Sequence, residues 1–171
     1  MIREDLIENV KQKLLKYRKL VLYGDSGVGK SYIAHHIANT LLWHKILVVD
    51  ELHRRMPRAA RYVIGTTTTE VWNQKALHFK SHGYHGYQIL ETTREETISI
   101  LYKLKPYFEV LRGIKLSDLD IQFLYITAEK RMNTRAFPAR AVDLMDMVSA
   151  RRALKNGVIR FRNSKSKSRT R

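Results

Sequence analysis

The fold is decided by a short stretch near the amino terminus: Leu20-Val21-Leu22-Tyr23-Gly24-Asp25-Ser26-Gly27-Val28-Gly29-Lys30-Ser31. The first four residues are apolar and end at a glycine, which is the pattern of a buried strand. Residues 24–31 match G-x-x-x-x-G-K-[ST] at every fixed position, and helical periodicity follows them. Glycines let successive backbone N–H groups converge on phosphate oxygens, and the helix N-terminus adds partial positive charge. We therefore predict a phosphate-binding P-loop over residues 24–31.

Two side chains of this loop add a charge and a metal ligand to the backbone cradle. Lys30 carries an ammonium that can contact the β and γ phosphates of a nucleotide, and the Ser31 hydroxyl can ligate Mg²⁺. We therefore predict ATP and Mg²⁺ as cofactors. The loop residues predicted to bind them are Gly24, Asp25, Ser26, Gly27, Val28, Gly29, Lys30 and Ser31.

An acidic pair closes the second apolar run of the chain. Residues 46–49 are Ile-Leu-Val-Val, and Asp50 and Glu51 follow directly. In a P-loop sheet, a carboxylate at the end of a buried strand lies near the metal. We predict that Asp50 holds Mg²⁺, directly or through water, and that Glu51 orients and deprotonates the attacking water. An Asp-Glu pair is common after strands, so by itself it is weak evidence for a metal site. The P-loop that precedes it in the sequence makes this interpretation stronger.

The hydrophobic pattern elsewhere alternates between strand-like and helix-like stretches. We expect strands over residues 20–23, 46–50, 61–66 and 87–90. Helices are expected over residues 3–17, after the glycine loop to about 41, from Thr93 to near Pro106, from Ser117, and from Pro138 to Gly157. This alternation predicts an α/β fold with a mostly parallel sheet. The expected division is a P-loop domain over residues 1–91, a helical domain over 92–157 and a basic tail over 158–171.

Composition limits the class of protein. The 171 residues, 44% of them hydrophobic, suffice for one domain with a small annexe. The absence of cysteine excludes disulfides, thiolate metal sites and cysteine nucleophiles. No apolar run approaches the ~20 residues that span a bilayer, and the acids at residues 4 and 5 differ from a secretory signal. We expect no membrane partner, and either the cytoplasm or an organellar lumen as compartment.

Much of the net charge of +16 lies at the carboxyl end. Residues 151–171 hold nine Lys or Arg and no acid, whereas the first 150 residues carry a net +7. Such a block is usually solvated, but it can also bind polyanions by releasing counterions. Nucleic acid is therefore one candidate partner, and a solubilising or targeting tail is the alternative.

Four stretches, in order along the chain, resemble the first ATPase domain of the Clp/Hsp100 branch of the AAA+ ATPases. Residues 46–53 (ILVVDELH) are similar to its Walker B motif, and residues 63–70 (VIGTTTTE) to its sensor-1 strand and the following loop. Residues 95–110 resemble the start of its helical lid, and residues 137–146 (FPARAVDLMD) its lid motif L-P-D-K-A-I-D-L-I-D. The resemblance spans residues 3–155 and implies an AAA+ parallel sheet with a small C-terminal helical lid.

The resemblance implies two further site residues. Thr67 falls at the sensor-1 position, where a polar group lies near the γ phosphate and the attacking water. Arg140 falls at the basic residue of the lid motif, from which it could touch the phosphates. The alternatives are a strand-end hydroxyl for Thr67 and an exposed helix charge for Arg140. The resemblance also implies other AAA+ subunits as partners, either copies of this chain or a full-length Clp-type protein.

The chain departs from the family in three places. Only 19 positions separate Ser31 from Asp50, so the family's additional strand and aromatic pore loop are missing, and the segment from Glu51 to Thr67 is also short. No arginine occurs from Lys75 to Leu90, where the family carries its arginine finger. A missing finger costs ~10³–10⁵ in turnover, so we expect slow or partner-dependent hydrolysis.

Two weaker patterns have mainly structural interpretations. His78, His82 and His85 have zinc-like spacing, but glycines at 83 and 86 argue against a helix, and a polar surface loop is the favoured interpretation. Arginines at 54, 55, 58 and 61 follow the Walker B stretch and could face a ring neighbour or nucleic acid, although solvated charge is the default explanation.

Three functional hypotheses follow. The first is a shortened Clp/Hsp100-like ATPase module of low intrinsic activity. The second is a catalytically weak adaptor that co-assembles with a full-length Clp-type unfoldase. The third is a nucleic-acid-associated helper ATPase, which the basic tail suggests and the lid motifs disfavour. A truncated gene product with no stable role is also compatible with the sequence.

Overall fold

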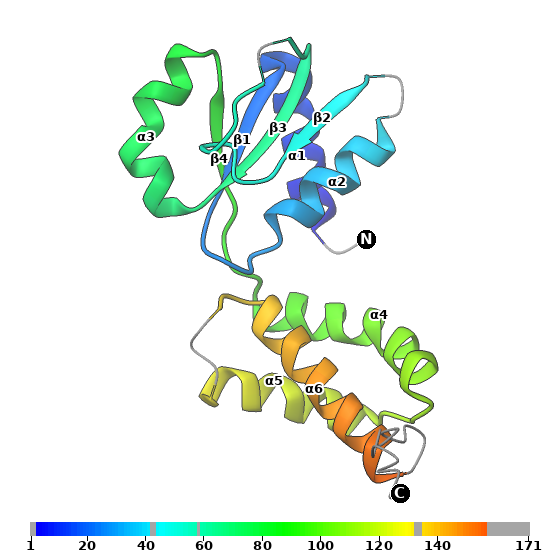
Figure 1. Ribbon diagram of the computed structural model, residues 1–171. Helices are drawn as coiled ribbons and strands as arrows, with labels where there is room; N and C mark the ends of the chain where they lie inside the picture. Colours follow the sequence, from blue (N-terminus) through cyan, green and yellow to red (C-terminus); the bar gives the residue numbers. More distant parts are fainter. Residues whose placement is uncertain (1–2, 42–43, 58, 132–134, 157–171) are drawn as a thin grey trace, which may run out of the picture.

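The computed structural model describes residues 3–41, 44–57, 59–131 and 135–156 (Figure 1). The elements in chain order are α1 (Glu4–Tyr17), β1 (Lys19–Tyr23), α2 (Lys30–Thr40), β2 (Ile46–Val49), β3 (Tyr62–Thr67), α3 (Thr69–Ser81), β4 (His85–Gln88), α4 (Arg94–Arg112), α5 (Asp118–Arg131) and α6 (Ala139–Lys155). The predicted α/β class is confirmed. The tail over residues 158–171 and Gly157, the predicted end of the last helix, lie outside the described residues.

The four strands form one parallel sheet in the order β2-β3-β1-β4. The strand β3 therefore lies between β1, which leads into the glycine loop, and β2, which leads into Asp50. Because all strands run the same way, their carboxyl ends meet at one edge of the sheet. The glycine loop, the acidic pair and the threonines at the end of β3 are thus brought to that edge.

Each face of the sheet is covered by its own helices (Figure 1). Apolar side chains of the strands alternate between the two faces. Leu20 and Leu22 of β1 pack in a core with Ile33 and Ile37 of α2 and with the buried side of α1. Val21, between them, belongs to the core on the opposite face. That core includes Leu52, Val63, Trp72, Phe79 and Tyr84, to which α3 contributes Trp72 and Phe79. The sheet is therefore covered on both faces, as its apolar strands require.

Helices α4, α5 and α6 pack together as a separate group beside the carboxyl edge of the sheet (Figure 1). Their shared core includes Leu101, Phe108, Ile121 and Met145. As predicted, Thr93 caps α4. Its hydroxyl accepts from the Glu96 N–H at 3.2 Å, while the Glu96 carboxylate accepts from the Thr93 N–H at 3.0 Å.

Two helix predictions were wrong. The sequence places the end of α4 near Pro106, but the helix continues to Arg112 and contains this proline. Burial of Leu101 and Phe108 on either side of Pro106 outweighs the lost backbone hydrogen bond. The helix α3 was not predicted, and it contains His78, with His82 at its C-cap, whereas a loop was expected there.

The three histidines of that segment are separated by this arrangement. His85 lies in β4 and its ring stacks on Tyr17 with centroids 3.9 Å apart, while His78 and His82 lie at the end of α3. Among the described residues, no group of three or more His, Cys, Asp or Glu side chains is arranged to hold a metal ion. No helix in the described part of the chain has both the length and the hydropathy to cross a membrane.

Candidate functional site: a polar hollow between sheet and lid

The glycine loop has the curled backbone that the motif predicts. Gly27 and Gly29 have φ values of 98° and 95°, in the left-handed region that side chains other than glycine rarely adopt. A Cβ on Gly27 would lie 2.8 Å from the Ala139 Cβ and 2.9 Å from the Ala136 carbonyl oxygen. The loop therefore needs glycine both for its turn and for the close approach of the segment that begins α6.

Lys30 begins α2 and is folded back over the loop. Its ammonium Nζ donates to the carbonyl oxygens of Gly24 at 2.9 Å and Asp25 at 2.7 Å. Partial burial lowers the pKa of Lys30 from its ordinary value, and the carboxylates of Asp25 and Asp50 oppose that shift. The loop thus holds a partly desolvated cation at the place where a phosphate would approach.

Asp50 is held by two hydroxyl groups. Its Oδ1 accepts from Ser31 Oγ at 2.6 Å and from Thr66 Oγ1 at 2.8 Å. The hydrogen bond from Ser31 is the main cause that lowers the pKa of Asp50; the bond from Thr66 adds to it, and desolvation acts in the opposite direction. Asp50 is therefore ionised at neutral pH. A hydroxyl and a carboxylate oxygen this close form a donor set that suits Mg²⁺, a hard cation.

Glu51 and Thr67, the predicted catalytic residues, both line the same hollow. Glu51 adopts a left-handed φ of 51°, and its N–H donates to Thr66 Oγ1 at 3.3 Å. Its carboxylate is about half exposed and pairs with the Arg54 guanidinium at 2.8 Å. The Thr67 hydroxyl, which is buried, lies 3.3 Å from His53 Nδ1.

These groups surround a hollow of about 590 Å³ between the glycine loop and the lid helices. Lys30, Ser31, Asp50, Glu51 and Thr67 line it from the sheet side. Arg135 and Asp143 line it from the lid side. A volume of this size, with a cation, hydroxyls and carboxylates converging on it, suits a polar ligand carrying phosphate groups.

Arg140, which the lid motif predicts near the phosphates, is not among the residues that line this hollow, and its contact with a nucleotide stays a prediction. Its guanidinium pairs with Glu91 at 2.8 Å and lies 4.0 Å from the Phe137 ring centroid. Glu91 also accepts from the Phe137 N–H at 2.8 Å. Arg140 therefore ties the start of α6 to the segment that leads into α4.

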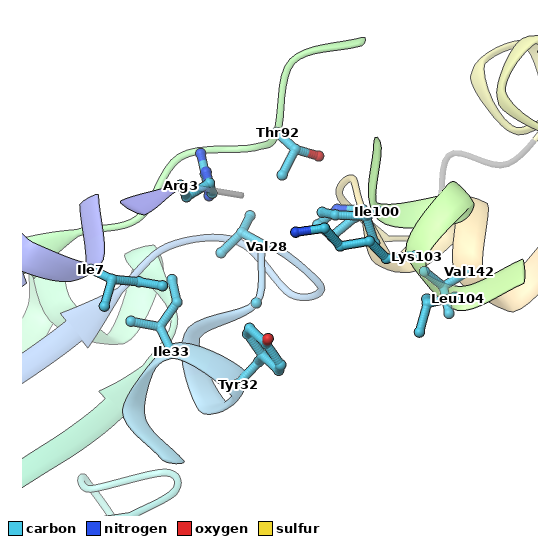
Figure 2. Close-up of a pocket in the computed structure, with 12 residues that line it drawn as sticks. Arg3, Ile7, Val28, Tyr32, Ile33, Thr92, Ile100, Lys103, Leu104 and Val142 are labelled. Carbon is cyan, nitrogen blue, oxygen red and sulfur yellow. The ribbon is translucent and has the colours of Figure 1, made fainter. Parts of the chain in front are cut away.

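A second hollow, of about 290 Å³, adjoins the loop where α1, α2 and the lid meet. Its walls are mainly apolar. Figure 2 shows Ile7, Val28 and Ile33 on the sheet side facing Ile100, Leu104 and Val142 on the lid side. Val28, one of the loop residues predicted to bind the cofactor, is nearly fully buried here. An apolar slot beside a phosphate cradle has the character needed for a heterocyclic base.

Sequence reasoning did not select Thr66, Arg135, Asp143 or His53 as site residues. Thr66 stands in a run of four threonines, and only the register of β3 against its neighbours shows which hydroxyl meets Asp50. Arg135 precedes the lid motif, and its place on the hollow depends on how the lid packs. His53 was visible as the last residue of the DELH stretch, and that stretch is the one signal that could have identified it.

The comparisons with known proteins agree with this geometry. A family model described as an AAA lid domain matches residues 93–170. The chaperone protein ClpB of Enterococcus faecalis is 31% identical over 129 residues, which covers 61% of this chain. The ClpB of Bacillus cereus is 30% identical over 126 residues and covers 72%. The chain belongs to the Clp/Hsp100 group of AAA+ proteins.

Solved structures of another protein of the group show the same fold. The Saccharomyces cerevisiae Hsp104-ADP complex superposes with a TM-score of 0.80 over 92% of this chain, at 19% identity. Hsp104 with ATPγS and FITC casein gives a TM-score of 0.77 over 92%, at 17% identity. This is an α/β AAA+ fold with a helical lid.

The match concerns a small part of each relative. This chain covers 14% of the Enterococcus faecalis ClpB and 13% of the Bacillus cereus ClpB. It covers 38% and 40% of the two Hsp104 chains. The family membership therefore fixes the type of module and not the activity of the whole relatives.

Proposed function

We propose that this chain is a nucleotide-binding AAA+ module that holds Mg·ATP between its glycine loop and lid and hydrolyses it slowly or only with a partner. The observation that carries the proposal is the hydrogen-bonded group of Ser31, Asp50 and Thr66 at the edge of the hollow that Lys30 also lines. These residues combine a cation for phosphate with two oxygen donors for Mg²⁺.

The two hollows suit different parts of a nucleotide, because one is polar and the other is apolar. The polar one, lined by Lys30 and Ser31, would take the phosphates, and the backbone N–H groups of the loop would face their oxygens. The apolar one, lined by Val28 and Ile33, would take the base. Gly29 lines both hollows, so a single ligand can run from one to the other past the loop.

The chain's own residues have separate tasks in hydrolysis. Bound Mg·ATP supplies the phosphoanhydride bond and the metal charge that neutralises the phosphates. Asp50 and Ser31 would hold the metal, and Lys30 would hold the phosphates. Glu51 would accept the proton of the attacking water, and Thr67 would help to orient that water.

Slow turnover is proposed from two observations. No arginine occurs between Lys75 and Leu90, where the family carries the residue that acts on a neighbouring subunit's nucleotide. In addition, the Glu51 carboxylate is engaged by Arg54 in this conformation. A neighbouring AAA+ subunit, from this chain or from a full-length Clp-type protein, is the proposed source of the missing charge.

The Glu51–Arg54 pair also supports a second candidate, an adaptor that binds nucleotide in order to assemble with a Clp-type partner. The two functions differ in turnover once the partner is present. Phosphate release measured alone and with a full-length Clp-type protein separates them. Stimulation that is lost in Glu51→Gln of this chain indicates an ATPase, whereas stimulation that survives this change indicates an adaptor.

Calorimetric titration with Mg·ADP and Mg·ATPγS tests the binding step itself. We expect Lys30→Ala to weaken both nucleotides about tenfold or more, because a charge-assisted contact to phosphate is worth ~1.5–3 kcal/mol. Lys80→Ala, on the exposed side of α3, is the matched control and should bind as the unchanged protein does. Equal affinities of the unchanged protein and Lys30→Ala would refute the proposed site.

A further inference from the structure

Two of the three histidines in the 78–85 segment come together at the end of α3. The imidazole rings of His78 and His82, one helical turn apart, have centroids 4.5 Å apart and planes tilted by 55°. Both residues are exposed. His85, the third histidine of the pattern, lies in β4 and stacks on Tyr17 instead. The spacing that suggested three ligands therefore brings two imidazoles onto one face of a helix.

The backbone that carries the two rings is fixed to the sheet domain. Phe79, which lies between them in sequence, is fully buried, and its carbonyl oxygen accepts from the N–H groups of His82 at 3.1 Å and Tyr84 at 3.0 Å. The Lys19 ammonium, at the start of β1, donates to the His82 carbonyl oxygen at 3.4 Å. The two imidazoles therefore extend from an anchored end of the helix.

A hydrogen bond fixes the tautomer of His82. Its Nδ1 lies 2.9 Å from the carbonyl oxygen of His78, and a carbonyl can only accept, so Nδ1 carries the proton. In the neutral ring, Nε2 then keeps its lone pair. Metal-bound histidines usually make the same kind of bond from their other ring nitrogen, because it orients the ring. The ring of His78 makes no hydrogen bond within the part of the chain that the structure describes, so its nitrogens are open to a ligand.

The setting suits a cation that prefers nitrogen ligands. Two histidines four positions apart on a helix have the spacing of the zinc-binding H-E-x-x-H pattern. The last carbonyl groups of a helix carry partial negative charge, which attracts a cation and offsets the charge of the nearby Lys19. Neutral imidazole binds Zn²⁺, Ni²⁺ and Cu²⁺, whereas Mg²⁺ and Ca²⁺ prefer oxygen ligands. Two protein ligands leave the other positions to water, so binding should be weaker than at a structural zinc site with four protein ligands.

We propose that His78 and His82 form a surface site for a borderline divalent transition-metal ion, with Zn²⁺ as its simplest occupant. The bound ion joins His78 to the C-cap of α3 and so holds the last turn of that helix. The site lies at the edge of the sheet away from the lid, because α3 begins at Thr69, which contacts the glycine loop, and runs away from it (Figure 1). It is therefore separate from the Ser31–Asp50 pair, and it does not depend on the proposed nucleotide-binding function.

Calorimetric titration of the full chain with ZnCl₂, followed in parallel by NMR of the histidine ring protons, tests the site. We expect a dissociation constant in the micromolar range and shifts of the His78 and His82 ring signals, which separate this site from zinc bound elsewhere on the chain. His78→Gln and His82→Gln should each weaken this binding about tenfold or more, because a single imidazole remains. An excess of Mg²⁺ should not displace the zinc, because Mg²⁺ prefers oxygen ligands.

His85→Gln is the matched control. His85 belongs to the same sequence pattern, but its ring stacks on Tyr17 instead of joining the pair, so this variant should bind zinc as the unchanged protein does. Thermal unfolding verifies that each variant is folded, and zinc should raise the melting temperature of the unchanged protein and of His85→Gln more than that of the other two variants.

Three results would overturn the inference. The first is zinc affinity that stays unchanged in both His78→Gln and His82→Gln. The second is an equal loss in His85→Gln, which would indicate zinc held by all three histidines. The third is binding to the unchanged protein no tighter than millimolar.

Discussion

The Glu51 carboxylate lies 2.8 Å from Nε of Arg54, three residues further along the chain. Glu51 is the proposed base for the attacking water. The ion pair with Arg54 therefore competes with the transfer of a proton from that water to Glu51. Both side chains are largely exposed, at 54% and 73%. An exposed ion pair contributes at most about 1 kcal/mol of interaction free energy, so it can slow proton transfer to Glu51 without preventing it.

Arg54→Ala is therefore expected to raise the turnover of ATP by up to about fivefold, which is the rate equivalent of 1 kcal/mol. Nucleotide affinity should stay unchanged, because Arg54 is not among the residues that line the hollow. Steady-state phosphate release by Arg54→Ala, with Arg55→Ala as the control, measures the effect. A fall of tenfold or more would instead make Arg54 a catalytic residue that replaces the missing arginine finger.

Glu51→Gln is expected to bind Mg·ATP as the unchanged protein does and to lose at least about 100-fold in turnover. A general base acts on the transition state more than on the bound ground state, and its removal typically costs ~10²–10⁴ in rate. Turnover and calorimetric affinity are measured on the same preparation. A parallel loss of affinity and turnover would assign Glu51 a structural role, consistent with its N–H bond to Thr66.

The sequence was sufficient to predict the elements that are marked by local chemistry. Apolar runs located β1, β2 and β3, and the Thr93–Glu96 capping box marked the start of α4. The helix α3 was missed because its inward positions are few. Trp72 and Phe79 are the two buried residues of this helix, which is too sparse a pattern to show helical periodicity.

The grouping of the glycine loop and the acidic pair could be predicted because it depends on the backbone, whereas the lid residues that line the hollow depend on packing. The glycine loop and the acidic pair follow strands, so strand direction alone brings them together. Which of the threonines meets Asp50 depends on the pairing of β3 with β2, in which Val49 lies opposite Gly65. Which lid arginine faces the hollow depends on Glu91, which lies outside the lid motif and engages Arg140.

Thr66 supplies a test of that packing. Its buried hydroxyl donates to Asp50 Oδ1 and accepts the N–H of Glu51. Thr66→Val keeps the shape and removes both bonds, so we expect a loss of about 1–3 kcal/mol in unfolding free energy and weaker Mg²⁺-dependent ATP binding. Denaturant unfolding and calorimetry measure the two effects. Thr66→Ser should retain the metal-dependent binding, and an unchanged Thr66→Val protein would show that Asp50 needs only Ser31.

The lid is expected to lose stability in acid through one carboxylate, that of Asp120. Asp120 accepts hydrogen bonds from the Arg152 guanidinium at 2.8 and 3.0 Å and from the Ser117 N–H at 2.7 Å. The hydrogen bonds from Arg152 are the largest cause that lowers the pKa of Asp120 far below its ordinary value. A carboxyl whose pKa is depressed on folding stabilises the protein above its unfolded pKa of about 3.9, and the contribution is lost as the pH falls from there toward the folded pKa. Asp120→Asn should therefore lower the melting temperature at pH 7 and have a smaller effect at pH 3. Because both partners remain partly exposed, the loss at pH 7 should be about 1 kcal/mol rather than the larger figure that the pKa alone implies.

Asp118→Asn, two residues earlier and three-quarters exposed, is the control. An equal loss at both pH values would contradict an ionic origin and assign the effect to the hydrogen bonds that cap α5.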